Sequence, residues 1–206
     1  KSVNKKYVFE TLENEGKIFD ENGIVLETTG GAFGGGDESA VNGDTKVKIQ
    51  KNENNNTPTV NNVFGGGNTA DVKGNATVTM TEGTVSLDVY GGGKGQTTVV
   101  GGDVTVNLGT KTGDSAPYTY TGTGLVTGNV YGGSALGAVN ATKDATTGEL
   151  SYTDGKKTEV NIYAGTVNGS VFGGGLGHDD TEDNTKDTVA QNFGNTTVTI
   201  ENSDNS

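Results

Sequence analysis

The stretch Val63-Phe64-Gly65-Gly66-Gly67 indicates how this chain folds, because it is one copy of a repeated motif. Each copy consists of a small apolar residue, an aromatic residue and a glycine-rich run. The other four copies are Ala32-Phe33-Gly34-Gly35-Gly36, Val89-Tyr90-Gly91-Gly92-Gly93, Val130-Tyr131-Gly132-Gly133-Ser134 and Val171-Phe172-Gly173-Gly174-Gly175. The aromatic positions 33, 64, 90, 131 and 172 are 31, 26, 41 and 41 residues apart. The basic unit is therefore at most about 26 residues, and the longer gaps contain insertions.

A second motif follows the glycine run and predicts a strand. It has the form Val-x-Gly-[Asp/Asn]-x-x-Val-x-[Ile/Met/Leu] and occurs at residues 41–49, 72–80 and 100–108, with a degraded copy at 194–200. Apolar residues two positions apart, such as Val78 and Met80 between threonines, are typical of a half-buried strand. Glycine followed by Asn or Asp predicts a corner with positive φ before each strand.

A third motif leads the chain back to the next aromatic residue. It reads Gly83-Thr84-Val85 and Gly165-Thr166-Val167, with a related segment at Val126-Thr127. Three short strands and three turns in each unit predict one coil of a three-sided parallel β-helix, whose coils stack about 4.8 Å apart. Inward Val, Ile, Leu and Ala side chains from successive coils would form one narrow core. We therefore expect an all-β solenoid of about five to six coils.

The insertions predict loops at two corners of this solenoid. Residues 51–58 and 110–124 follow the strand of the second motif, whereas 140–157 and 178–192 precede it. Residues 1–22 fit no coil and suit an N-terminal cap on a repeat domain formed by 23–206. The chain begins at Lys1 without an initiator methionine or a signal peptide and ends directly after a strand-like segment. We therefore expect it to be a fragment of a longer, processed protein.

Composition and charge exclude several classes of protein. Glycine supplies 36 of 206 residues, which excludes a helical bundle, and the glycines lack the every-third-residue period of collagen. The net charge is −12 and all 14 basic residues are lysine, which argues against nucleic acid and anionic lipid as partners. No apolar run approaches the ~18 residues of a membrane span, so we expect no membrane insertion. Without cysteine there is no disulfide framework and no thiolate metal site.

With these motifs in register, the chain resembles the glycine-rich right-handed β-helix repeats of bacterial cell-surface proteins. This is the architecture of pectin-lyase-like proteins and of autotransporter passenger domains, and the resemblance covers residues 23–202 approximately. It implies a right-handed parallel β-helix at the cell surface or outside the cell. The resemblance specifies the fold better than the function, because such solenoids serve as adhesins, stalks, phage tail spikes and polysaccharide lyases. No catalytic motif of these families is matched residue by residue.

The aromatic residues of the first motif are the candidate binding residues. If the preceding Ala or Val points inward, strand alternation sends the rings outward beside a strip of glycine, where they could stack on sugars or mediate self-association. The alternative is that the rings stack inside the fold or at a covered corner. The five candidates are Phe33, Phe64, Tyr90, Tyr131 and Phe172.

The densest acidic segment is the candidate calcium site. It contains Asp179, Asp180 and Asp183 beside the single histidine, His178. Clustered carboxylates are ligands that Ca²⁺ prefers, but the spacing of calcium-binding β-roll repeats and of EF-hands is missing, so a solvated loop is the alternative. The glycine runs do not form a phosphate-binding loop, because no helix and no Lys-[Ser/Thr] pair follows them at the required spacing.

These features predict a non-enzymatic, extracellular bacterial surface module, either an adhesin or a stalk. Its corner loops would contact a host or bacterial surface protein or a glycan, self-association along the solenoid is possible, and no cofactor is required. The alternatives are a carbohydrate-binding or carbohydrate-active β-helix, such as a polysaccharide lyase or glycoside hydrolase, and a phage tail-spike-like fibre. Many polysaccharide lyases use arginine, which this chain lacks, and its acidic residues lie mostly in turns and loops.

Overall fold

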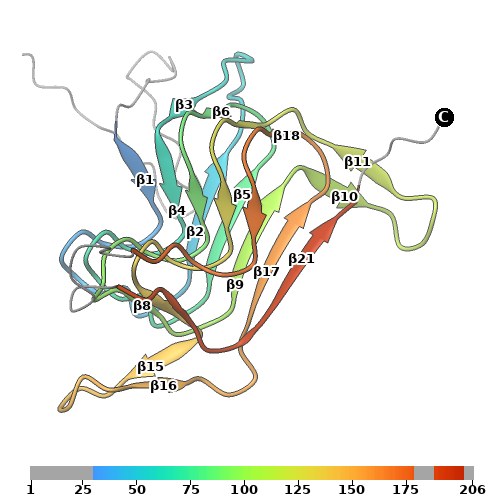
Figure 1. The fold of residues 1–206 in the computed structure, drawn as a ribbon. Helices are drawn as coiled ribbons and strands as arrows, with labels where there is room; N and C mark the ends of the chain where they lie inside the picture. Colours follow the sequence, from blue (N-terminus) through green and yellow to red (C-terminus); the bar gives the residue numbers. More distant parts are fainter. Residues whose placement is uncertain (1–29, 179–187, 202–206) are drawn as a thin grey trace, which may run out of the picture.

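The computed structural model describes residues 30–178 and 188–201, and the statements below refer to those residues (Figure 1). Within them the chain is all-β, with parallel sheets and no helix. Accordingly, the described part of the chain contains no helix of the length and hydropathy that a membrane span requires. The expected N-terminal cap, residues 1–22, lies outside the described residues.

The second motif forms the longest strands of the molecule, in a sheet that we call the long-strand sheet. In spatial order, its strands are β2 (Thr45–Ile49), β5 (Ala76–Met80), β9 (Val104–Leu108), β17 (Lys157–Ile162) and β21 (Asn195–Ile200). All pairs are parallel and in register, so one column contains a valine from every strand: Val47, Val78, Val106, Val160 and Val198. Side chains alternate between buried and less buried along β5 and β9, as the period-2 pattern predicted.

The first motif forms a second parallel sheet, the aromatic sheet. Its strands, in order, are β1 (Gly31–Phe33), β4 (Asn62–Phe64), β7 (Val89–Tyr90), β13 (Val130–Tyr131) and β19 (Val171–Phe172). The Gly-Thr-Val segments belong to the return sheet, which leads back to the aromatic sheet. It contains β18 (Thr166–Val167), β12 (Leu125–Val126), β6 (Thr84–Val85) and β3 (Thr59–Val60).

The sequence predicted three strands per unit, and this prediction is wrong, because the structure has a fourth, short strand. A fourth parallel sheet, the short sheet, lies between the aromatic and long-strand sheets along the chain. It is formed by β8 (Val99–Val100), β14 (Ala138–Val139) and β20 (Gln191–Asn192), and isolated parallel bridges join Val41 to Val72 and Val72 to Val100. The first valine of the second motif, Val41, Val72 or Val100, lies in this sheet, but two apolar residues are too few to show the period of a strand.

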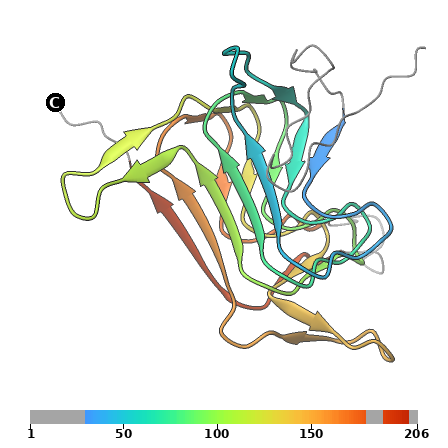
Figure 2. The same ribbon diagram turned by 180° about the vertical axis from the view of Figure 1, so that it is seen from behind.

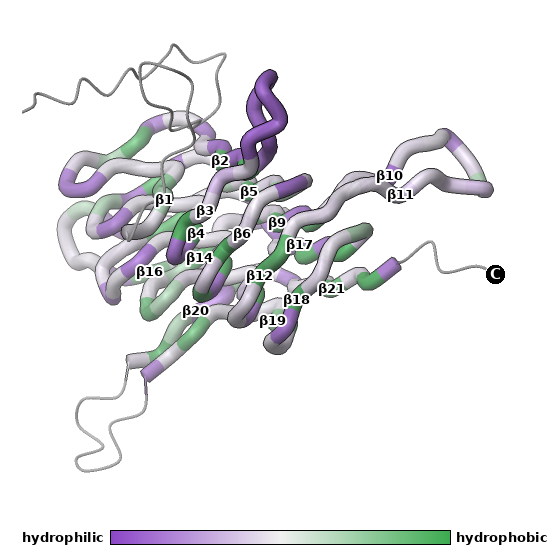
Figure 3. Tube along the Cα trace, turned by 90° about the horizontal axis from the view of Figure 1, so that it is seen from above, coloured by the Kyte–Doolittle hydropathy of each residue, from purple (hydrophilic) through white to green (hydrophobic). Residues whose placement is uncertain are grey.

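Each circuit through the sheets, which we call a pass, lies against the next pass. Figure 3 shows the described passes side by side, with β1 and β2 at one end and β18, β19 and β21 at the other. The inward valines of three sheets form the main core, which includes Val63, Val85 and Val106. No single pass could bury these side chains, so the stacking of passes is what stabilises the fold.

The corners before the long strands are not the positive-φ turns that the Gly-[Asp/Asn] pairs predicted. Among the described glycines with positive φ are Gly83 and Gly165 of the third motif, but not Gly74 or Gly102. Instead, the acidic or amide side chain at each corner accepts a hydrogen bond from the next pass. Asp44 Oδ1 accepts from the backbone N–H of Asn75 (2.7 Å), and Asn75 Oδ1 accepts from that of Asp103 (2.8 Å). The Asx residue therefore links neighbouring passes rather than shaping its own turn.

Two of the expected corner loops are antiparallel hairpins. The first, the tyrosine hairpin, pairs β10 (Thr110–Thr112) with β11 (Thr119–Thr121) between the long-strand and return sheets. The second, the charged hairpin, pairs β15 (Ala141–Lys143) with β16 (Leu150–Tyr152) between the short and long-strand sheets. Figures 1 and 2 show them projecting from different corners of the stack. Of the insertion 178–192, residues 179–187 lie outside the described residues.

Candidate functional site

The five aromatic residues of the first motif form one column of stacked rings. Neighbouring ring centroids are 4.7 to 5.0 Å apart, and the ring planes differ by 3° to 12°. The column runs from Phe33 through Phe64, Tyr90 and Tyr131 to Phe172, because the parallel register places each ring over the next. Its spacing equals the separation of parallel strands, so the sheet itself positions the rings.

The column does not form the open platform on which a row of sugars could stack. Phe64, Tyr90 and Tyr131 are buried in a cluster separate from the main core, with Ala135 packed against them. The rings do lie on the opposite side of the strand from Val63, as alternation predicted, but the chain covers them there. For these three residues the alternative prediction, that the rings are covered, is therefore the correct one. Phe33 is half-buried, and only the terminal Phe172 is substantially exposed, at 44%.

Burial of the column also changes the ionisation of its tyrosines. Burial is the main reason that the pKa of Tyr90 rises well above its ordinary value, and the neighbouring Asp88 carboxylate raises it further. The Tyr90 hydroxyl donates to Asp88 Oδ2 at 3.3 Å. Burial raises the pKa of Tyr131 as well. Both hydroxyls therefore remain protonated at neutral pH and act as neutral packing groups.

The candidate calcium ligands Asp179, Asp180 and Asp183 lie outside the described residues. The segment that contains them begins and ends at an antiparallel bridge, in which the backbones of His178 and Thr188 exchange two hydrogen bonds of 2.8 Å. His178 is exposed at this bridge. In residues 30–178 and 188–201, no three His, Cys, Asp or Glu side chains form a group that could hold a metal ion.

Sequence reasoning missed a polar cluster on the tyrosine hairpin. Lys111 on β10 places its ammonium group 4.0 Å from the ring centre of Tyr118 and 5.9 and 6.0 Å from those of Tyr120 and Tyr163. Distances of this size allow cation–π attraction. The rings of Tyr118 and Tyr120 meet edge to face, with centroids 6.5 Å apart.

Glu201 connects this cluster to the last strand of the stack. Its Oε2 accepts from Lys111 Nζ at 2.5 Å and from the Tyr120 hydroxyl at 3.0 Å. The hydrogen bond from Lys111 is the main reason that the pKa of Glu201 is lowered, and the same bond raises the pKa of Lys111. The tyrosine hairpin is thereby fixed to Glu201, although Lys111 and Glu201 are 90 residues apart in the sequence. No sequence signal joins residues so far apart, and only the stacking of passes brings them together.

This ion pair makes the order of the tyrosine hairpin dependent on pH. A carboxyl group whose pKa is lowered by folding contributes stability above its ordinary pKa, and that contribution is lost as the pH falls through the folded value. We therefore expect the heteronuclear NOE of the hairpin amides to stay constant down to the ordinary glutamate value of 4.5 and to fall only at more acidic pH. In Glu201→Gln the NOE should be low at every pH, while the charged hairpin remains unaffected. An equal loss of order in the two hairpins of Glu201→Gln at neutral pH would contradict this role of Glu201.

Comparison of the chain with protein-family models, with curated proteins and with solved structures finds no match.

Proposed function

We propose that this chain is a right-handed parallel β-helix and serves as a non-enzymatic, extracellular module of a bacterial surface, an adhesin or stalk that presents its hairpins to a partner. The observation that carries the proposal is the attachment of the tyrosine hairpin to the stack. A hairpin of two three-residue strands is marginally stable alone. Here Lys111 and Tyr120 tie it to Glu201 on the last pass, so it projects in a defined orientation.

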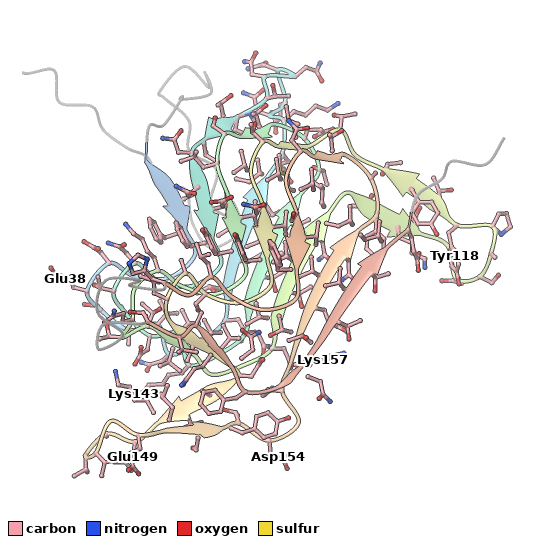
Figure 4. All side chains as sticks on the ribbon, viewed as in Figure 1. Glu38, Tyr118, Lys143, Glu149, Asp154 and Lys157 are labelled. Atoms are coloured by element: carbon pink, nitrogen blue, oxygen red, sulfur yellow. The ribbon has the colours of Figure 1, made fainter. Side chains whose placement is uncertain are left out.

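The exposed side chains of this hairpin suit a contact surface. Tyrosine provides a large, amphipathic area at a low cost in conformational entropy, and tyrosine and tryptophan dominate the energetic centres of interfaces. Tyr118 is 38% exposed, and the Lys111 ammonium lies over its ring. The charged hairpin, in contrast, presents Lys143, Glu149 and Asp154 on the other side of the stack (Figure 4). The two projections therefore differ in chemistry, and the tyrosine hairpin is the better candidate for a binding surface.

The stack explains why loops of this kind can project from a stable support. Every described pass contacts its neighbours through backbone hydrogen bonds in several parallel sheets, so the passes form a regular scaffold. Recognition on such a scaffold is usually placed in the inserted segments.

Carbohydrate binding is the second candidate, and the same cluster favours it. Tyrosine rings beside one ammonium and one carboxylate group can combine stacking with hydrogen bonds to sugar hydroxyl groups. This site replaces the aromatic column as the candidate glycan surface, because the middle rings of the column are buried.

A binding screen tests both proposals with a matched pair of variants. The 206-residue chain is applied to a glycan array and to a panel of host-matrix and bacterial surface proteins, and any ligand is then titrated against Tyr118→Ala and Tyr152→Ala. Tyr152 is 43% exposed on the charged hairpin, so the two substitutions remove similar exposed area from different projections. We expect Tyr118→Ala to weaken binding at least about tenfold, which corresponds to the loss of one energetically important aromatic contact.

The binding of the two variants decides which hairpin is the contact surface. Tyr152→Ala should bind like the parent chain. Loss of binding in Tyr152→Ala with full binding in Tyr118→Ala would show that the tyrosine hairpin is not the contact surface. Conversion of an arrayed polysaccharide into shorter products would overturn the non-enzymatic proposal.

A further inference from the structure

The outer face of the long-strand sheet carries a regular array of polar side chains. Residues between the inward apolar residues of β5, β9 and β17 point away from the core, because side chains alternate along a strand. In register they form two partly exposed columns, Thr77-Thr105-Glu159 and Thr79-Asn107-Asn161. We call these six residues the outer polar face, and Glu159 is the one charged residue among them.

The tyrosine hairpin borders this face where the strands end. Tyr163 follows Asn161 by two positions, so it continues the outward side of β17. Its ring centre lies 6.4 Å from that of Tyr120 on the hairpin. Figure 4 shows Lys157 where β17 begins and Tyr118 beyond the far end of the strand. The aromatic rings and the outer polar face therefore form one continuous surface.

An amide pair on the outer polar face offers a hydrogen-bond donor and an acceptor side by side. Asn161 Nδ2 donates to Asn107 Oδ1 at 2.9 Å, across neighbouring strands. Among the described residues, Asn161 Oδ1 and Asn107 Nδ2 have no further partner. A sugar hydroxyl group both donates and accepts hydrogen bonds, so it can satisfy either atom. Together with the nearby rings, the pair provides the two contacts that a sugar makes, which are hydrogen bonds and stacking.

The charges around this surface are already paired, which favours a neutral ligand. Lys157 Nζ lies 2.9 Å from Glu159 Oε1, and Lys111 Nζ lies 2.5 Å from Glu201 Oε2. A carboxylated or sulfated ligand would have to compete with these carboxylates for the lysines. The net charge of −12 repels such a ligand as well. A ligand that carries only hydroxyl groups meets neither obstacle.

We propose that the outer polar face and the tyrosine hairpin together bind a neutral glycan. The exposed ring of Tyr118 stacks on one sugar unit, and Asn107 and Asn161 bind hydroxyl groups of the units that lie on the sheet. A protein partner fits less well, because the centre of a protein interface is mostly apolar, whereas the outer polar face contains no apolar side chain. This inference rests on the proposed function, since the hairpin is the same site, and it adds the sheet face and the ligand class.

Affinity gel electrophoresis of the 206-residue chain tests the ligand class. Native gels contain dextran, mannan, galactan or a β-glucan as neutral probes, or polygalacturonate as the anionic probe. We expect at least one neutral probe, and not polygalacturonate, to retard the chain. With that probe, Asn107→Ala/Asn161→Ala should raise the dissociation constant at least about tenfold, because two hydrogen-bonding positions are lost. Asn168→Ala is the matched control, because it removes the same side chain from an exposed position after β18, in the return sheet.

Two-dimensional amide NMR spectra of the parent chain test the contact without any substitution. The side-chain NH₂ groups of asparagine give their own signals in such spectra. When the retarding probe is added, the signals of Asn107 and Asn161 should shift, because their amide groups exchange water for sugar hydroxyl groups. The signals of Asn168 should stay where they are.

Failure of this inference can be told apart from failure of the proposed function. The inference is overturned if no neutral probe retards the chain, if polygalacturonate binds more tightly than the neutral probes, or if the screen finds only a protein ligand. It is also overturned if the double asparagine variant binds like the parent chain. In that case, weaker binding of Tyr118→Ala would show that the glycan contacts the hairpin alone, and the proposed function would stand. Thermal unfolding of the same samples shows that the variants are folded.

Discussion

Replacing Gly66 by alanine is expected to lower the free energy of unfolding by about 3 kcal/mol, close to the upper end for overpacking. The added Cβ would lie 2.7 Å from the backbone N of Gly93 and 2.9 Å from its Cα. Backbone atoms cannot rotate away as a flexible side chain can, so the two passes would have to separate. The hydrogen bond from Gly66 N–H to the carbonyl oxygen of Gly92, 3.0 Å long, would be strained at the same time. Chemical denaturation of the two chains, parent and variant, measures the loss.

Gly174→Ala is the control for this substitution, because it makes the same chemical change at the equivalent position of the last described pass. Its Cβ atom would meet nothing within 4 Å. Alanine also reduces the conformational entropy of the unfolded chain, so we expect a change between zero and a gain of about 1 kcal/mol. Similar losses for the two variants would mean that contact between passes is not what requires glycine in this column.

Replacing Asn140 by alanine is expected to cost about 4 kcal/mol. Asn140 is fully buried at the base of the charged hairpin, and its Nδ2 donates to the carbonyl oxygens of Gly102 (2.9 Å) and Lys157 (3.0 Å). Its Oδ1 accepts from the Thr158 hydroxyl at 2.8 Å. Alanine would leave two buried polar groups, the Gly102 carbonyl and the Thr158 hydroxyl, without these partners, and each such group costs about 1 to 3 kcal/mol before the site relaxes. Equilibrium unfolding monitored by far-UV circular dichroism gives the change.

Part of that cost comes from the backbone, and Asn55→Ala isolates it. Asn140 has a φ of 58° and Asn55 a φ of 61°, in the left-handed region that asparagine tolerates better than alanine. Asn55 is exposed, so its substitution should cost only about 1 kcal/mol. The difference between the two variants is the contribution of the buried hydrogen bonds. If Asn140→Ala were no more destabilising than Asn55→Ala, the network would contribute nothing.

The repeated motifs were sufficient to predict the parallel pairing and its register. The motif that ends in Ile49, Met80 and Leu108 aligned the long strands, because inward residues two apart have to match between neighbours. Placement of the insertions at two corners also followed from the repeat, and two of these insertions fold as hairpins. Alternation predicted the side of the strand on which the rings lie, but whether they are exposed depends on how the chain returns over them.

Other features depend on contacts between passes. The short sheet contains two-residue strands such as Val99–Val100, which show no period, although Val100 begins a copy of the second motif. Asn140 was only the first residue of an expected insertion, and its role depends on Gly102 in one pass and Lys157 after the hairpin. The cluster around Lys111 combines residues from β10, β11, the turn after β17 and the position after β21. No spacing rule relates these segments, because the intervening insertions vary in length.

The antiparallel hairpins are places where the sequence can change in length without disturbing the stack. The two ends of the tyrosine hairpin lie side by side where they leave the stack, since Thr110 pairs directly with Thr121. The same holds for Ala141 and Tyr152 in the charged hairpin. Residues between such paired ends can be lengthened, shortened or exchanged without moving the strands before and after them. The two corners are therefore natural grafting points, at which new sequences can be tried while the rest of the molecule keeps its register.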